Sequence, residues 1–209
     1  MAERRGRLAL LVVGSALLAA CTVADAPNAI DVHTWRAQKD RFMKSAESPV
    51  PPELRPAFPP LDYFPVDPAY NIPASLTVAP GEEILELSTS GGLRRKMRKI
   101  GTLQFTLKDQ ALTLTAFVDA GTNDVRRLFV PFGDLTNGSE TYPGGRYLDL
   151  ERTATGIYEL DFNRAYNPFC VFNVSYDCPY PPRENRLKVP LRAGERLPKA
   201  GYGPPAITR

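Results

Sequence analysis

Residues 101–118 read GTLQFTLKDQALTLTAFV and decide the fold class. In 101–107 and again in 111–118, apolar residues recur at alternate positions, the period of a β-strand with one buried face. Lys108-Asp109, between the two runs, is typical of a turn. The stretch therefore predicts two short strands separated by a turn.

The same alternation, interrupted by turn residues, extends over residues 74–195. Further candidate strands lie at 84–87, 127–132, 146–150, 157–162 and 187–191. Turn residues such as Pro80-Gly81, Gly91-Gly92 and Asn137-Gly138 separate them. Because no helical pattern lies between these runs, we predict a mainly β fold, either an antiparallel sandwich or a partly open barrel.

One helix and a proline-rich segment are predicted before this β body. Residues 31–46 have an amphipathic helical pattern, with Asn28 or Asp31 as the N-cap. Its apolar face comprises Val32, Trp35, Phe42, Met43 and Ala46. Residues 49–73 contain nine prolines, which exclude a helix or a central strand. Aromatic residues at Phe58, Tyr63, Phe64 and Tyr70 indicate that this segment wraps across the domain.

The N-terminal residues predict export and a lipid anchor. Three arginines before residue 8 precede an apolar run that is too short to span a membrane. Residues 18–21, LAAC, resemble the lipobox of bacterial lipoproteins, which implies removal of residues 1–20 and acylation of Cys21. We therefore expect a signal peptide at 1–20, a lipidated tether at 21–28 and a single domain at 29–209 with a tail after residue 195.

The predicted location is the cell envelope, with the lipidated N-terminus in a membrane. Thr22, rather than an aspartate, follows the cysteine. This favours the outer membrane, facing the periplasm, in a host with two membranes. In other hosts we expect the outer face of the plasma membrane.

Charge and motifs limit the partners. The formal net charge of +3 falls to about +1 without residues 1–20, because these carry three arginines and one glutamate, so 3 − 2 = 1. A nearly neutral domain has no field that attracts nucleic acid, and we expect no such partner. The chain has one histidine, His33, and no glycine-rich phosphate loop. We predict no cofactor and no Ser-His-Asp catalysis, and the sequence leans against an enzyme.

Cys170 and Cys178 remain after lipidation of Cys21. An oxidising compartment favours a disulfide between them. Two thiols are too few ligands for zinc, and His33 is distant in the sequence. We expect the disulfide and no metal site.

Two polar runs, 146–151 and 157–163, contain the candidate ligand site. Alternation places Leu148 and Leu160 on one face, and pairing them would set Asp149 opposite Glu159 on the other. Opposed like charges need a cation or a shared proton between them. Arginines here could hold a carboxylate or phosphate, although a solvated sheet face is the alternative. The candidate residues are Arg146, Tyr147, Asp149, Asp161, Asn163, Arg164, Tyr166, Glu184 and Asn185.

Two further polar features favour structural roles. Backbone capping and turn chemistry explain Glu184 and Asn185, after Pro181-Pro182, better than a site does. The basic run 94–99 could contact anionic lipid headgroups, but a charged edge strand is favoured.

Several stretches resemble domain-of-unknown-function family 1684. They are VPFGDLTNGSETY at 130–142, GGRYLDL at 144–150, LDFNRAYNP at 160–168, Cys178-Pro179, and PPRENRL at 181–187. The resemblance spans about the whole mature domain, including the helix with Trp35. It implies a bacterial or archaeal domain of similar length with no established activity, so it assigns no site residue.

These observations favour a lipid-anchored binding module for a small polar ligand or an envelope component. One alternative is a hydrolase-like envelope enzyme that uses Asp149, Glu159 and Asp161 with Arg164. The other is a structural or assembly lipoprotein.

Overall fold

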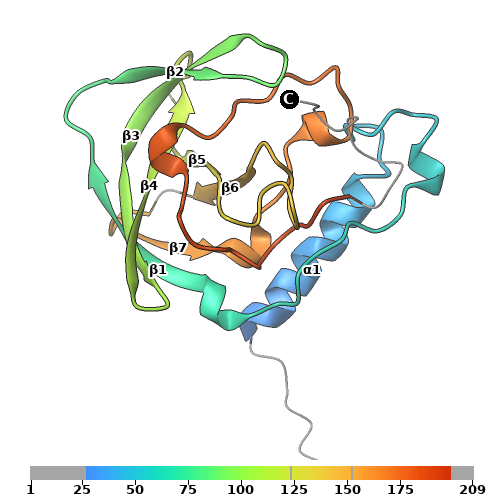
Figure 1. Ribbon diagram of the computed structural model, residues 1–209, viewed down its shortest axis with the longest axis horizontal. Helices are drawn as coiled ribbons and strands as arrows, with labels where there is room; N and C mark the ends of the chain where they lie inside the picture. Colours follow the sequence, from blue (N-terminus) through green and yellow to red (C-terminus); the bar gives the residue numbers. More distant parts are fainter. Residues whose placement is uncertain (1–26, 123, 152, 199–209) are drawn as a thin grey trace, which may run out of the picture.

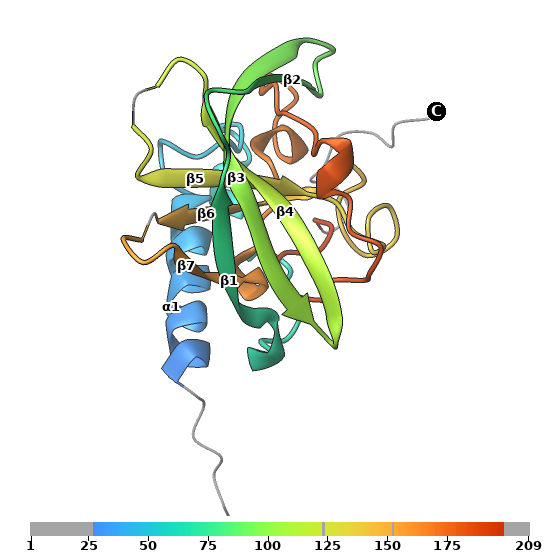
Figure 2. The ribbon, with the colours of Figure 1, turned by 90° about the vertical axis from the view of Figure 1, so that its left-hand side faces the viewer.

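A seven-stranded antiparallel sheet organises the chain in the computed structural model, which describes residues 27–122, 124–151 and 153–198. The strands are β1 (Asn71–Val78), β2 (Ile84–Ser88), β3 (Arg94–Leu107), β4 (Gln110–Asp119), β5 (Arg127–Phe132), β6 (Arg146–Glu151) and β7 (Ile157–Asp161). The order is β6-β5-β4-β3-β1-β7, and β2 pairs with β3 off this path. The strands curl into a nearly closed barrel, which confirms the predicted fold class (Figures 1 and 2).

Strands β3 and β4 form the hairpin predicted from residues 101–118. Lys108 and Asp109 both have positive φ, 49° and 62°, as a tight two-residue turn matching the strand twist requires. The register sets Leu103 opposite Leu114, and both side chains are fully buried inside the barrel. Each such leucine contributes roughly 1.5–3 kcal/mol through burial. Strand β3 also bends at Gly101, where a Cβ would lie 2.4 Å from the Thr77 carbonyl oxygen.

The predicted pairing of β6 with β7 is wrong. Strand β6 pairs with β5, so that Asp149 lies opposite Phe129, while β7 pairs with β1, so that Glu159 lies opposite Pro73. Strand β1 offers buried Ile72 opposite Leu160, and this partner lies far upstream in the sequence. The predicted alternation itself holds, because Leu148, Leu150, Tyr158 and Leu160 are buried, and the carboxylates of Asp149 and Glu159 between them are exposed.

The ends of the sheet meet at one point. The Tyr147 N–H donates to the Tyr166 carbonyl oxygen at 2.9 Å, and the Tyr166 N–H donates back at 3.0 Å. Among the described residues, no ladder joins β6 to β7. The barrel is therefore closed by this bridge and by side-chain packing.

Strand β1 contains Pro73, although the prolines of 49–73 were expected to exclude a central strand. The Leu76 N–H donates to the Gly156 carbonyl on the β7 side. Because alternate residues direct their backbone groups to opposite neighbours, the nitrogen of Pro73 faces β3. Pairing with β3 begins only at Ser75, so no ladder hydrogen bond is lost.

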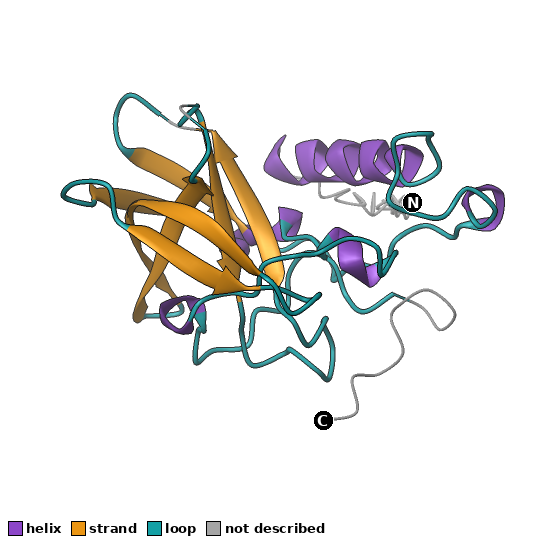
Figure 3. Cartoon of the chain, turned by 90° about the horizontal axis from the view of Figure 1, so that it is seen from above, coloured by secondary structure: helices purple, strands orange, loops and turns teal. Residues whose placement is uncertain are grey.

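Helix α1 (Pro27–Phe42) lies outside the barrel (Figure 3). It begins before the predicted Asp31 and ends before the predicted Ala46, so residues 27 and 28 belong to the helix rather than the tether. Asp31 pairs with Arg164 instead of capping the helix. No helix among the described residues is long and apolar enough to cross a bilayer. The predicted signal peptide and Cys21 lie outside the described residues.

The proline-rich segment packs against the body as expected. It contains short 3-10 turns at Arg55–Ala57 and Pro68–Tyr70. The aromatic side chains of Phe58, Phe64 and Tyr70 are buried. Further 3-10 turns lie at Phe162–Arg164, Phe169–Val171 and Arg183–Asn185.

Two strand predictions need correction. Residues 187–191 are irregular, although Leu187 and Leu191 still fill the core. The basic run 94–99 is not an edge, because it lies in β3 with β2 on one side and β4 on the other. Three of its cations, Arg95, Arg98 and Lys99, pair with carboxylates, as Arg95 does with Asp119 at 2.7 Å. Figure 1 shows this part of the sheet at the opposite end of the molecule from the start of α1.

Candidate functional site

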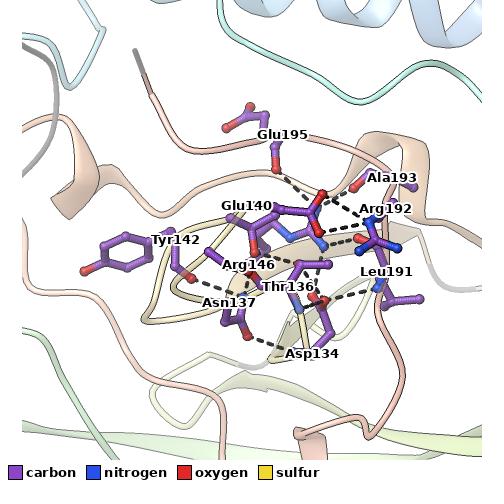
Figure 4. Close-up of polar contacts among 12 residues, drawn as sticks. Asp134, Thr136, Asn137, Glu140, Tyr142, Arg146, Leu191, Arg192, Ala193 and Glu195 are labelled. Carbon is purple, nitrogen blue, oxygen red and sulfur yellow. Dashed lines mark hydrogen bonds and ion pairs between the residues drawn. The ribbon is translucent and has the colours of Figure 1, made fainter. Parts of the chain in front are cut away.

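Arg146, a candidate ligand-binding residue, lies fully buried at the start of β6. Its guanidinium donates to the Asp134 carboxylate at 2.9 Å and to the carbonyl oxygens of Leu191 (2.8 Å), Ala193 and Glu195 (3.2 Å) (Figure 4). Burial lowers the pKa of Arg146, and the neighbouring Asp134 carboxylate opposes that shift. We call this arrangement the Arg146 clamp. It fixes residues 187–196, the C-terminal strap, to the barrel.

The carboxylate of the clamp is held by its own loop. Asp134 Oδ1 accepts hydrogen bonds from the Thr136 N–H at 2.8 Å and the Leu191 N–H at 3.1 Å. Gly145, before the arginine, has φ of 93°, and a Cβ there would lie 2.6 Å from the Phe132 carbonyl oxygen. The loop therefore serves to present Asp134 to Arg146.

A second buried ion pair attaches helix α1 to the same strap. Lys39 Nζ lies 2.5 Å from Glu195 Oε1, and the Glu195 side chain is fully buried. Burial lowers the pKa of Lys39, and Glu195 partly offsets this. The Asn167 N–H donates to the other Glu195 oxygen at 2.8 Å. Glu195 thus joins α1, the strap and the chain after β7.

Three other candidates from the sequence do not gather with the rest. Asn163 is fully buried and exchanges side-chain hydrogen bonds with the backbone of Asp67. Asn185 is fully buried and binds the backbone N–H and carbonyl of Thr115. Glu184 is exposed on the adjoining turn. Asn185 thus has a structural role, as the sequence favoured, but it joins the backbones of β4 and β5 rather than capping a turn.

Two adjoining cavities form what we call the aromatic groove. The first, about 340 Å³, lies beside β3, β5 and β6, and the second, about 320 Å³, lies beside α1. Both are lined by Tyr166 and Phe169. The aromatic lining is Trp35, Phe42, Phe129, Tyr147, Tyr166, Phe169 and Tyr176. Most neighbouring rings meet edge to face, as do Phe129 and Tyr147 with ring centres 4.7 Å apart, whereas Phe42 and Phe169 are stacked. These contacts let the walls support one another.

Polar groups lie at both ends of the groove. In the second cavity, the Tyr166 hydroxyl donates to Asp149 Oδ2 at 2.9 Å, and Lys39 Nζ lies 4.2 Å from the centre of the Tyr166 ring. Desolvation raises the pKa of Asp149, although the bond from Tyr166 lowers it. The first cavity carries Asp177 and the Arg95–Asp119 ion pair. The groove therefore combines an apolar centre with polar ends.

Tyr147 and the two cysteines form part of the wall. The Tyr147 hydroxyl donates to the Pro179 carbonyl oxygen at 2.6 Å. Cys170 and Cys178 are free thiols in the structure, so the expected disulfide is not formed there. They are nevertheless neighbours, because the Cys170 N–H donates to the Cys178 sulfur at 3.3 Å.

A third hollow, about 680 Å³, lies between the edges of β6 and β7 and brings together Asp149, Asp161 and Arg164. Arg164 already pairs with Asp31 and with Asp161, the latter at 3.3 Å. The positive charge of Arg164 is therefore already paired with carboxylates of the protein itself. Glu151 and Glu159 also line the hollow, which makes it acidic.

Sequence reasoning missed Trp35, Lys39, Phe129, Phe169 and Tyr176 as groove residues. The density of aromatic residues between 166 and 180 was an available signal. No pattern linked that segment to α1, because their contact is purely tertiary. Among the residues that the structure describes, no group of His, Cys, Asp and Glu side chains could hold a metal ion.

Comparison with known families agrees with the resemblance in the polar blocks. The family model described as "Protein of unknown function (DUF1684)" matches residues 56–196. The chain belongs to DUF1684. The matched range includes the barrel, the Arg146 clamp and the strap up to residue 196. It begins after α1, so the helix with Trp35 and Lys39 lies outside the DUF1684 match.

A solved structure has the same overall fold as this DUF1684 chain. It is the solution NMR structure of an uncharacterized protein of Haloarcula marismortui, with 40% sequence identity and a TM-score of 0.64. The similarity covers 80% of this chain and 92% of the archaeal one. No curated protein matches the chain.

The Arg146 clamp predicts that Arg146→Lys destabilises the protein by about 3–5 kcal/mol in urea unfolding. A lysine ammonium cannot serve the Asp134 carboxylate and three carbonyl oxygens at once, which leaves buried groups unpaired. Arg192→Gln is the matched control, because Arg192 pairs with Glu140 on the exposed side of the same strap. We expect it to cost less than about 1 kcal/mol. Equal losses for the two variants would contradict the clamp.

The raised pKa of Asp149 predicts a pH-dependent effect of Asp149→Asn. A carboxyl group with a raised folded-state pKa loses its stabilising contribution as the pH rises through that pKa. The amide variant should therefore melt at a higher temperature than the wild type at pH 7. This gain should disappear below about pH 4, where the carboxyl is protonated in both states. Thermal unfolding across this range checks it, and a lower melting temperature of the variant at pH 7 would count against it.

Proposed function

We propose that this protein is a lipid-anchored envelope protein that binds a small ligand in the aromatic groove. The main observation in support is that two adjoining cavities share Tyr166 and Phe169 and have aromatic walls and polar ends. Each cavity falls within the roughly 300–1,000 Å³ that small-molecule sites occupy. Such sites join apolar walls to a few polar groups that orient the ligand.

Charge at the α1 end favours a cationic or donor group on that ligand. The positive charge of Lys39 is matched by Glu195, so the Asp149 carboxylate leaves that end with a negative excess. The Tyr166 hydroxyl already donates to Asp149, and the carboxylate can accept a further donor. Aromatic faces attract cations, and Lys39 Nζ already lies 5.4 Å from the centre of the Trp35 ring in this cavity. A flat apolar body with one cationic end is thus the ligand class that fits best.

The lipid anchor would place the groove near a membrane. Cys21 lies six positions before Pro27, where α1 begins. Six extended residues reach at most about 20 Å. Because α1 itself forms one side of the groove, a ligand from the envelope would meet the site close to the bilayer. The sequence signals for export remain the basis of this placement.

A carboxylate-based enzyme is the second candidate, and the hydrogen bond between Tyr166 and Asp149 favours it. A raised pKa, as at Asp149, is a common property of carboxyl groups that transfer protons in enzymes. The sequence-based hypothesis of an enzyme also used Arg164. The ion pairs of Arg164 with Asp31 and Asp161 weigh against that role. Loss of a measured turnover in Asp149→Asn, in a variant that is folded and at least as stable as the wild type, would favour the enzyme.

Binding is tested with three probes of one shape, namely benzamidine, benzamide and benzoate. Trp35 is the only tryptophan and lines the groove, so its fluorescence reports occupancy. We expect affinity to fall in the order cationic, neutral, anionic. Loss of a charge-assisted hydrogen bond should weaken benzamidine binding about tenfold or more in Asp149→Asn.

Glu159→Gln is the matched control for this experiment. Glu159 is an exposed carboxylate on β7 that lines the acidic hollow but not the groove. Its removal should leave benzamidine affinity unchanged. Equal weakening in both variants, or no binding of any probe, would reject the groove as the site and favour a structural role.

A further inference from the structure

Cys170 and Cys178 lie side by side in the wall of the first groove cavity. Both are buried, and they pack with Tyr147 against the rings of Phe129 and Tyr166. The Cys170 N–H donates to the Cys178 sulfur, and Cys178 itself lines the cavity. A reagent in the cavity therefore meets one thiol directly and the other immediately behind it.

The surroundings of the pair favour a reactive sulfur. The hydrogen bond between the two thiols lowers the pKa of Cys170 to about 6, against the opposing effect of burial. The same bond, together with burial, raises the pKa of Cys178, so Cys170 is the sulfur that ionises first. The hydroxyls of Ser90 and Tyr142 contribute in the same direction. A thiolate rather than a thiol is the nucleophile in disulfide exchange.

The segment that holds the two cysteines contributes much of the cavity. Residues 169–179, the thiol loop, supply Phe169, Tyr176 and Asp177 to its lining. The loop is attached at its end, where Tyr147 donates to Pro179 and the Cys178 N–H donates to Ser90 Oγ at 3.0 Å. A change at the sulfurs therefore occurs within a segment whose C-terminal end is fixed.

We propose that Cys170 and Cys178 form a redox-active dithiol that exchanges with a small organic disulfide entering the groove. One cysteine thiolate attacks a sulfur of the disulfide RS–SR, forming a mixed disulfide and releasing RS⁻. The second cysteine thiolate attacks the protein sulfur of that mixed disulfide and releases the second RS⁻. The protein loses two electrons and two protons, and the disulfide is reduced to two thiols, RSH.

This inference goes beyond ligand binding and does not depend on the cationic ligand proposed above. It also differs from a permanent structural bridge, because it requires exchange in both directions. Access through the cavity reaches Cys178, and Cys170, whose pKa is lowered, lies next to it, so both features support exchange by the pair. An inert structural disulfide requires neither access from a cavity nor a cysteine with a lowered pKa.

The test uses the full chain in buffers with increasing ratios of oxidised to reduced glutathione. Free thiols are alkylated, and the tryptic peptide 165–183, which holds both cysteines and not Cys21, is weighed by mass spectrometry. We expect the disulfide-bridged fraction of this peptide to rise with the ratio of oxidised to reduced glutathione. The fraction should fall again when reduced glutathione is added. Cys170→Ser and Cys178→Ser should each instead accumulate a single glutathione adduct.

Three results would overturn the proposal. The first is a peptide that stays fully alkylated even in oxidised glutathione alone. The second is a bridge that persists unchanged in reduced glutathione alone, which would indicate a structural cross-link. The third is glutathione adducts on the wild type with no internal bridge. None of these bears on benzamidine binding, so the two proposals fail separately.

Discussion

The buried guanidinium of Arg146 joins parts of the chain that are far apart in sequence. It binds the loop before β6 through Asp134 and the C-terminal strap through three carbonyl oxygens. The strap carries Glu195, which binds Lys39 of α1 and the backbone of Asn167. One side of the aromatic groove is therefore positioned through two successive buried ion pairs, and the groove depends on the first of them.

Burying these charges costs free energy, which explains why most of their polar atoms, though not Arg146 Nε, have partners within the fold. A charge removed from water is tolerated only when its partners are in place. Asp134 is oriented by Thr136 and Leu191, and Glu195 by Asn167. Apolar packing alone would fill this space with less demand on geometry. The buried ion pairs and hydrogen bonds fix one position of the strap, and that position sets the shape of the groove.

Local patterns predicted the strands but not which of them pair. The alternation in residues 101–118 and 127–132 gave strands at the right places, because period and turn chemistry are properties of neighbouring residues. The same alternation assigned the faces of β6 and β7 correctly. Their pairing was missed because β1, which lies far upstream, competes for β7. Pro73 further disguised β1 as a non-strand segment.

The candidate site was likewise predicted only where neighbouring residues determine it, and not where distant segments meet. Tyr147, Asp149 and Tyr166 were expected to lie together, and they line the groove. Arg146, Asn163 and Asn185 have polar side chains in an apolar sequence context, a pattern shared by ligand sites and by buried structural networks. Only the three-dimensional contacts separate these cases. Trp35 and Lys39 come from a helix outside the barrel, and no sequence spacing connects them to residue 166.

Native-state hydrogen exchange tests the clamp most directly. The Leu191 N–H donates to Asp134, and the Glu195 N–H donates to the Ala165 carbonyl oxygen at 2.8 Å. If the clamp holds the strap, both amides should exchange as slowly as the buried amides of β3 and β4, through global unfolding alone. Exchange of these two amides at the rate of exposed loop residues, while the barrel stays protected, would contradict the account.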